Sequence, residues 1–394
     1  MAKICKLIRQ HSFEDIRIFE KEAMSLRKLG HEVTIVTGKF NGYVFGPDLF
    51  LNQNPEFQKD HFIYRDIHFL TYDIQHYTLS SSHIIGMIKN LLEDKQDYFV
   101  DKLYETALST NADVYHAHEW QTLYEAVQIK KTLRKKGKHV KVIFDAHELE
   151  SDNLLLTLLM KEVDHLITVS DSIKEIYEER YPEIPITLIY NSPYYQDEIT
   201  MNKDKESFTI AYEGVLTSQK GDPERILDIA NLCNTKMTNF HFVIFGRMPE
   251  FNEHYKLMYK KIRENPSIIL RWVKYHDLPK EYQTVHIGYI FFDTKEQNRM
   301  YALPNKFFSY LNNGVPVVVN HSKEMKNFIE KHECGIVIDK AEPTAEDYVE
   351  AFLKLYEDRE LLSRMSKKGR EAMQKIYCWQ KMEERLAEVY NSLI

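Results

Sequence analysis

A polar, basic helix start leads directly into an apolar strand at residues 303–318, which read LPNKFFSYLNNGVPVV. Proline suits the first position of a helix and glycine the residue after its last turn, so Pro304 and Gly314 predict the two ends of one helix. The first backbone N–H groups of a helix have no partner within it, and the Asn305 amide and the Lys306 ammonium lie beside them. The segment therefore predicts a site for an anion such as a diphosphate.

Polar side chains also follow several predicted strands, at the edge of a parallel sheet where ligands bind. His118 and Glu119 come directly after one such strand, and we predict that they do the chemistry of the site. Further candidates at strand ends or at the start of the first helix are Asp15, Arg17, His147, Glu148 and Asn191. For these, ordinary helix caps and turns are the competing interpretation.

A metal site is not expected. His116 alternates with His118, but no third ligand with suitable spacing follows, and the chain has no Asp-x-Asp pair for a metal-bound diphosphate. A loop with Gly214 and Lys220 instead offers a compact cation that can meet a phosphate.

Composition limits the function further. At 394 residues the chain exceeds what one hydrophobic core usually serves, so we expect two domains. The 28% of charged residues net to −7, which gives no support to a nucleic-acid partner. The four cysteines lie far apart and read as reduced thiols of a cytoplasmic protein. Residues 1–10 have too short an apolar run for a signal peptide, and no run is long enough to span a membrane.

Strand and helix patterns alternate along the chain. Apolar residues at helical spacing over 15–29 end at Gly30, and a strand at Val33–Val36 follows, which is typical of a parallel βαβ unit. Residues 39–82 interrupt the series and contain one expected strand, Phe62–Leu70. The pattern predicts an α/β fold with two Rossmann-like, doubly wound domains in tandem and a ligand site in the cleft between them.

Periodicity is lost over residues 194–206, where we place the domain boundary. We expect an N-terminal domain at 1–195, a linker at 196–206, a C-terminal domain at 207–376, and a terminal helix at 377–394 that packs back on the N-terminal domain.

Across nearly the whole chain, the motifs resemble those of the retaining glycosyltransferase family 4, whose fold is called GT-B. LRKLGHEV at 26–33 is similar to "L-x-x-x-G-H-x-V", and DVYHAH at 113–118 is similar to "D-V-x-H-x-H". GVLTSQKG at 214–221 resembles the "G-R-L-x-x-x-K-G" phosphate loop, and residues 303–318 resemble the "P-N-K" variant of the donor motif. Each motif alone is weak, but their order and spacing together are specific.

Two departures from the family pattern concern the donor. Val215 stands where the family usually has an arginine on the diphosphate, and Tyr301 and Ser309 stand where it has a pair of glutamates for the sugar and the ribose. Lys306 and Arg299 are expected to restore positive charge, and Arg247 at a strand end is another candidate. The resemblance thus implies these donor-binding residues: Gly214, Lys220, Arg247, Arg299, Tyr301, Pro304, Asn305, Lys306 and Ser309.

The resemblance implies a metal-independent, retaining transfer of a sugar from a nucleotide-diphosphate donor to a hydroxyl of a glycan, lipid-linked or protein acceptor, without a cofactor. The missing glutamates leave open a non-catalytic protein of the same fold that binds a glycan or stabilises a partner. A nucleotide-sugar epimerase or a sugar-phosphate synthase is a third possibility.

The basic run at 130–138, KKTLRKKGK, stands out in an acidic chain. It could touch anionic lipid headgroups on the inner face of a membrane, which would suit a lipid-linked acceptor. A solvated helix end is the alternative.

Overall fold

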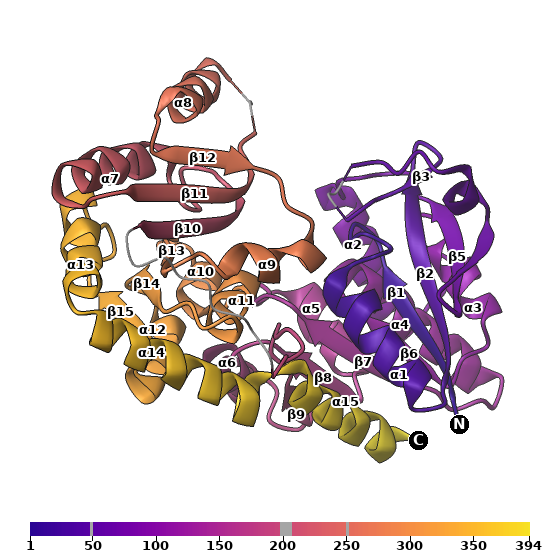
Figure 1. The fold of residues 1–394 in the computed structure, drawn as a ribbon. Helices are drawn as coiled ribbons and strands as arrows, with labels where there is room; N and C mark the ends of the chain where they lie inside the picture. The colour runs from indigo at the N-terminus through magenta and orange to yellow at the C-terminus, as the bar shows by residue number, and fades with distance from the viewer. Residues whose placement is uncertain (48–49, 198–206, 250–251) are drawn as a thin grey trace. The chain divides into compact units, whose positions relative to one another are not determined.

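The computed structural model describes residues 1–47, 50–197, 207–249 and 252–394, which form two compact units (Figure 1). The first unit holds Met1–Ile189 together with Glu383–Ile394, and the second holds Tyr190–Met382. Each unit is built on its own mainly parallel sheet with helices between successive strands, so the predicted α/β fold with two Rossmann-like domains is confirmed. Of the expected linker, residues 198–206 lie outside the described part.

The sheet of the first unit has the strand order β4-β5-β2-β1-β6-β7-β8-β9, with β3 paired to β2. Its strands are β1 (Lys3–Ile8), β2 (Glu32–Phe40), β3 (Tyr43–Val44), β4 (His61–Tyr64), β5 (Ile67–Asp73), β6 (Val114–Ala117), β7 (Lys141–Ala146), β8 (His165–Thr168) and β9 (Ile186–Leu188). The chain order reverses between β1 and β6, which are parallel neighbours. In such sheets a ligand binds beyond the carboxyl ends of the strands at this reversal.

The first helix begins where the sequence predicts but is not regular throughout. Asp15 caps it by accepting hydrogen bonds from the backbone N–H groups of Arg17 and Ile18, and a π-helical segment, η1 (Ile16–Ala23), continues as α1 (Met24–Lys28). The other helices of this unit are η2 (Pro55–Gln58), α2 (Ser81–Leu92), α3 (Leu103–Ser109), α4 (Trp120–Lys135), α5 (Leu154–Met160) and α6 (Asp171–Arg180).

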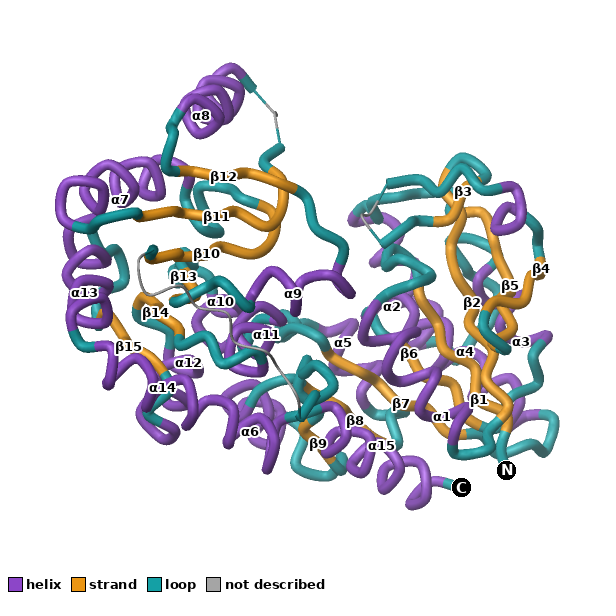
Figure 2. The backbone as a smooth tube through the Cα atoms, viewed as in Figure 1, coloured by secondary structure: helices purple, strands orange, loops and turns teal. Residues whose placement is uncertain are grey.

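The prediction of one strand at Phe62–Leu70 is wrong, because the chain turns back in the middle of it. Arg65 and Asp66 have positive φ angles of 49° and 61°, and the residues on either side form the antiparallel pair β4 and β5. Arg65 and Asp66 are two consecutive exposed polar residues that interrupt the apolar alternation, and the buried positions change phase across them. Figure 2 shows β4 and β5 side by side at the edge of the first sheet.

The sheet of the second unit has the order β12-β11-β10-β13-β14-β15, with its reversal between β10 and β13. The strands are β10 (Phe208–Val215), β11 (Phe240–Arg247), β12 (Ile268–Arg271), β13 (Ile287–Ile290), β14 (Val317–Asn320) and β15 (Gly335–Ile338). Buried side chains of β10, β11 and β13 form one core cluster with those of α7 (Pro223–Lys236) and α13 (Ala345–Glu357). That cluster fixes the strand ends at which the predicted donor residues lie.

The remaining helices of the second unit surround this sheet (Figure 1). They are α8 (Glu253–Glu264), η3 (Tyr275–Asp277), α9 (Leu278–Tyr282), α10 (Gln297–Tyr301), α11 (Asn305–Asn312), α12 (Lys323–His332), α14 (Arg359–Ala372) and η4 (Met373–Tyr377). The last helix, α15 (Trp379–Leu393), begins after the break expected near Cys378, and its residues from Glu383 onward belong to the first unit. None of the helices in the described residues is long and apolar enough to cross a membrane.

Candidate functional site

A buried ion pair organises the edge of the first sheet. The Arg17 guanidinium donates to both carboxylate oxygens of Asp145 at 2.9 and 2.8 Å and to the Ile189 carbonyl at 2.8 Å. Burial alone would raise the pKa of Asp145, but Arg17 and the neighbouring histidines hold it well below its ordinary value. Arg17, expected as a possible ligand contact, is therefore engaged in orienting Asp145, and Asp15 serves as a helix cap.

His118 lies against this carboxylate. Its Nδ1 is 3.2 Å from His147 Nε2 and 3.5 Å from Asp145 Oδ2, and His147 Nε2 is itself 3.1 Å from that oxygen. Burial and the nearby Lys6 ammonium lower the pKa of His118 well below its ordinary value, so the ring is neutral at pH 7. Its Nε2 is buried and has no hydrogen-bond partner among the described residues. This nitrogen is therefore the hydrogen-bonding position of the ring that the described residues leave unused.

A second buried ion pair holds His116, whose ring stacks on that of His118. Lys6 Nζ is 2.7 Å from Glu22 Oε2 and 3.0 Å from His116 Nδ1, and the ring of His116 stacks on that of His118 at 4.4 Å. The hydroxyl of Tyr390, from α15, lies 2.8 Å from the same His116 nitrogen. The position of the His118 ring thus depends on residues from both ends of the chain.

The sequence offers no third metal ligand at a suitable spacing from His116 and His118, but the fold brings two carboxylates next to them. One ligand atom from each of Glu22, His116, His118 and Asp145 lies within 4.8 Å of the others, a group that could hold a metal ion. Glu22 lies on η1, and Asp145 lies on β7, the parallel neighbour of β6. Both are far from the two histidines in sequence, so the spacing of residues along the chain does not indicate them.

Glu119 has a more structural setting than its neighbour. Its carboxylate accepts hydrogen bonds from the backbone N–H groups of Arg9, at 2.9 Å, and Gln10, at 3.0 Å. The carboxylate thereby fixes the loop after β1, and Glu119 is also the N-cap residue of α4.

The charge of Glu119 also acts on His11, which sequence reasoning missed. Burial tends to lower the pKa of His11, but Asp15 and Glu119 together raise it to about 9, so a histidine cation stands at this edge.

The other two candidates of this group are less central. Glu148 is exposed, and its charge helps to raise the pKa of the nearby Glu150. Asn191 is half-buried and falls within the second unit by its contacts.

In the second unit, Lys306 lies buried at the start of α11, after the β13 strand that borders the reversal. Its Nζ sits 4.0 Å from the centre of the Tyr212 ring, a cation–π contact. Gly214, with φ of 117°, leaves the space beside this ammonium, since a Cβ there would lie 3.3 Å from Nζ. Pro304 is the N-cap of α11 and Asn305 is its exposed first residue. The helix start, the cation and the glycine thus meet as predicted.

Glu213 is the residue of this site that the sequence interpretation missed. It accepts a hydrogen bond from the Tyr282 hydroxyl, and it faces Lys306 closely enough to act on its pKa. Burial lowers the pKa of Lys306 to about 7, an effect that Glu213 opposes and Lys220 reinforces. A carboxylate directly before Gly214 at the end of a buried strand was the available signal.

The affinity for a nucleoside diphosphate should fall as the pH rises from 7 to 9. Lys306 carries its proton below about pH 7 and loses it above, and only the protonated form attracts a phosphate. Calorimetry with UDP at several pH values measures this slope, and buffers of different ionisation enthalpy measure the proton taken up. A Lys306→Arg variant keeps its charge over this range, so its profile should be flat. A wild-type affinity that does not change with pH would contradict the assignment.

Two further predicted cations lie near this point. Lys220 is exposed in a tight turn, where its backbone N–H and C=O pair with those of Thr217 at 3.0 and 2.9 Å. Arg299, on α10, donates to Gln219 Oε1 at 2.9 Å and pairs with Glu296 at 2.7 Å. Both residues therefore border the loop that follows β10.

The other three predicted donor residues have different surroundings. The Arg247 guanidinium lies over the Trp272 ring at 4.8 Å, and the Tyr301 ring faces the Lys323 ammonium at 5.7 Å. Ser309 is buried within α11, and its carbonyl accepts from the Asn313 amide.

Two family models together match most of the chain. "Glycosyltransferase Family 4" matches residues 20–192, and "Glycosyl transferases group 1" matches residues 197–372. The chain belongs to the family 4 glycosyltransferases. No curated protein matches its sequence.

Solved structures share the fold of this glycosyltransferase over its full length. A sucrose-phosphate synthase from Thermosynechococcus elongatus has a TM-score of 0.70 at 13% identity, covering 100% of this chain and 99% of that one. A glycosyltransferase from Rickettsia africae gives 0.70 at 15%, covering 100% and 98%. The Anabaena protein HepE, in complex with UDP and glucose, gives 0.69 at 12%, covering 100% of both chains. These identities are low, so the likeness establishes the GT-B fold.

The basic run of this glycosyltransferase is largely neutralised by its own acidic residues. The ion pairs are Lys130–Asp164, Lys131–Asp94, Arg134–Glu162, Lys135–Asp94 and Lys138–Asp113. This pairing favours the solvated helix end over a lipid-binding patch.

Proposed function

We propose that this family 4 glycosyltransferase transfers a sugar, with retention, from a nucleotide-diphosphate sugar bound by the second unit to an acceptor hydroxyl bound by the first. The observation that carries the proposal is the buried Lys306 ammonium at the start of α11, beside Gly214. Glu213 offsets part of the charge of this ammonium, while Lys220 adds a second cation and the unpaired N–H groups of the helix start favour an anion, so a diphosphate suits the site. The complex of Anabaena HepE with UDP supports a uridine nucleotide as the first donor to test.

In the proposed reaction the bond between the sugar and the diphosphate breaks while the acceptor oxygen bonds to the sugar. The departing diphosphate gains negative charge, which Lys306, Lys220 and the start of α11 would stabilise. The leaving phosphate itself takes the acceptor proton, so no separate base is required. His118 would position a sugar or acceptor hydroxyl through its unpaired Nε2. The acceptor class would be a glycan, a lipid-linked glycan or a glycoprotein.

We further propose that no metal takes part. The four residues that could hold one already have two cations among them, since Lys6 Nζ is 2.7 Å from Glu22 and Arg17 pairs with Asp145 at 2.8 Å. Two carboxylates balanced by two cations leave little attraction for a dication. Sugar transfer should therefore continue in excess EDTA, and a loss of activity that Mg²⁺ or Mn²⁺ restores would contradict this part.

Calorimetry of the full chain with UDP, GDP and ADP tests the donor site. Nucleotide release from the matching nucleotide sugars is then measured with and without acceptor saccharides. Binding of one diphosphate, with release accelerated by an acceptor, is the expected result. Binding to none of the three would contradict the proposal.

A non-catalytic role is the second candidate, because Tyr301 and Ser309 lack the carboxylates of the family's glutamate pair. A chain in that role would bind the diphosphate or a glycan and release no nucleotide with any acceptor. An epimerase would instead convert the nucleotide sugar without an acceptor, and a sugar-phosphate synthase would require a sugar phosphate as acceptor.

A further inference from the structure

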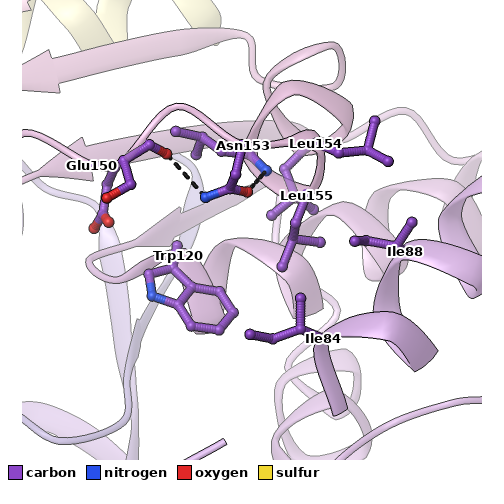
Figure 3. A pocket seen from close by; sticks show the side chains of 10 residues that line it. Ile84, Ile88, Trp120, Glu150, Asn153, Leu154 and Leu155 are labelled. Carbon is purple, nitrogen blue, oxygen red and sulfur yellow. Dashed lines mark hydrogen bonds between the residues drawn. The ribbon is translucent and has the colours of Figure 1, made fainter. Parts of the chain in front are cut away.

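A hollow of about 520 Å³ lies on the first unit. Most of its lining is aliphatic and comes from α2 and α5, and Trp120, which follows Glu119 directly, forms another part of it. Figure 3 shows the Trp120 ring beside Ile84, with Leu155 above both and Ile88 farther along the same helix. This volume is large enough for part of a small organic ligand.

One end of the hollow is polar. Glu150 is the one ionisable side chain in its described lining, which also includes Ser151 and Asn153. Burial, with repulsion from Glu148 and Glu119, raises the pKa of Glu150 to about 7. Figure 3 shows Trp120, which follows Glu119 directly in the chain, below Glu150 at this end of the hollow. A hydroxyl group at this end could donate to the carboxylate.

The opposite end is apolar and opens to the surface. Ile84 and Ile88 lie there with Leu154, which is 54% exposed (Figure 3). Ile85, exposed by 65%, and Leu92, by 62%, continue the apolar surface along α2. An aliphatic surface that begins in a hollow and continues over one helix is typical of a binding site for an apolar group.

We propose that this hollow binds the alkyl chain of an amphiphilic acceptor whose hydroxyl-bearing head lies at the Glu150 end. The proposal rests on the proposed sugar transfer and names its acceptor class. The change from polar to apolar along one cavity matches a head and a chain joined in one molecule, and Trp120, the residue after the predicted site residue Glu119, belongs to the lining. A plain oligosaccharide would leave the aliphatic end unfilled.

Calorimetry of the full chain with hexyl, heptyl and octyl β-glucosides, each below its micellar concentration, tests the inference. Affinity should rise about fourfold with each added methylene, since burying one contributes about 0.8 kcal/mol. Leu154→Asp should lower the octyl glucoside affinity at least about tenfold. Its matched control is Leu257→Asp, at a leucine that is 49% exposed on α8 of the second unit, and this variant should bind as the wild type does.

A UDP titration of the same samples separates this inference from the proposed function. An affinity independent of chain length, with UDP binding intact, would overturn the inference alone. Loss of UDP binding with the chain-length dependence intact would overturn the donor site alone. Self-association that Leu154→Asp abolishes, without any glucoside binding, would show that a second copy covers the hollow and would also overturn the inference.

Neutral phosphatidylcholine vesicles distinguish two sources of the alkyl chain. Pelleting with vesicles that is lost in Leu154→Asp would assign the chain to a membrane lipid. Binding of monomeric glucosides without pelleting would assign it to a soluble amphiphile. Both results support the alkyl site.

Discussion

Lys306→Ala lowers the affinity for UDP by about 1–3 kcal/mol, roughly five- to 150-fold. Lys306 is a buried cation whose ammonium lies at the start of α11 and over the Tyr212 ring, and Gly214 leaves the space that a phosphate oxygen would enter. Removing it takes away a charge-assisted contact that water cannot replace in a buried position. Calorimetry at pH 6.5 measures the loss with the lysine protonated.

The matched control for this change is Lys256→Ala, at a half-exposed lysine of α8 in the same unit, whose ammonium pairs with Glu253 at 2.7 Å. This variant should bind UDP as the wild type does. Circular dichroism shows whether each variant is folded, which matters because Lys306→Ala leaves Glu213 without its opposing charge. Equal affinity in a folded Lys306→Ala would place the nucleotide elsewhere.

Arg17→Met lowers the free energy of unfolding by about 3–5 kcal/mol. Its guanidinium is buried and neutralises both Asp145, at 2.8 Å, and Glu22, at 3.0 Å, so its loss leaves these carboxylates without that partner in a low-dielectric environment. The midpoint and slope of urea denaturation, followed by circular dichroism, measure the effect.

Arg65→Met is the matched control, because Arg65 is 44% exposed and forms a surface ion pair with Glu20 at 2.7 Å. Its loss should cost less than about 1 kcal/mol. If Arg17→Met were no more destabilising than Arg65→Met, the buried pair would not organise the sheet edge as described.

The sequence predicts the elements of this fold better than it predicts their contacts. The strand at the N-terminus and the helix after Asp15 follow from local patterns, and the structure has both. The turn at Arg65 and Asp66 was missed although aspartate is common in turns, because neither Gly nor Pro, the strongest markers of a turn, accompanies it.

Some residues of the two candidate sites are likewise indicated by local sequence patterns, whereas others are revealed only by contacts in the fold. Lys306, Gly214 and Lys220 come from turns and helix starts with a recognisable chemistry, so sequence reasoning found them. Lys6 and Glu22 were not found, since Lys6 lies in an otherwise apolar strand and Glu22 is one of several charged residues of η1, and only the fold shows that the two form a pair. Glu213 was also missed, although its place directly before Gly214 at a strand end is a signal in the sequence.

The contacts of the last residues of the chain determine when the first unit can finish folding. Glu383–Ile394 belong to the first unit, and Tyr390 reaches His116 there, yet all of Tyr190–Met382 is translated in between. While only the first part of the chain has left the ribosome, the buried His116 lacks its hydrogen-bond partner Tyr390. Contacts so distant in sequence form slowly and late. We therefore expect the first unit to stay loosely packed during translation and to reach its native form only after the second unit has been made.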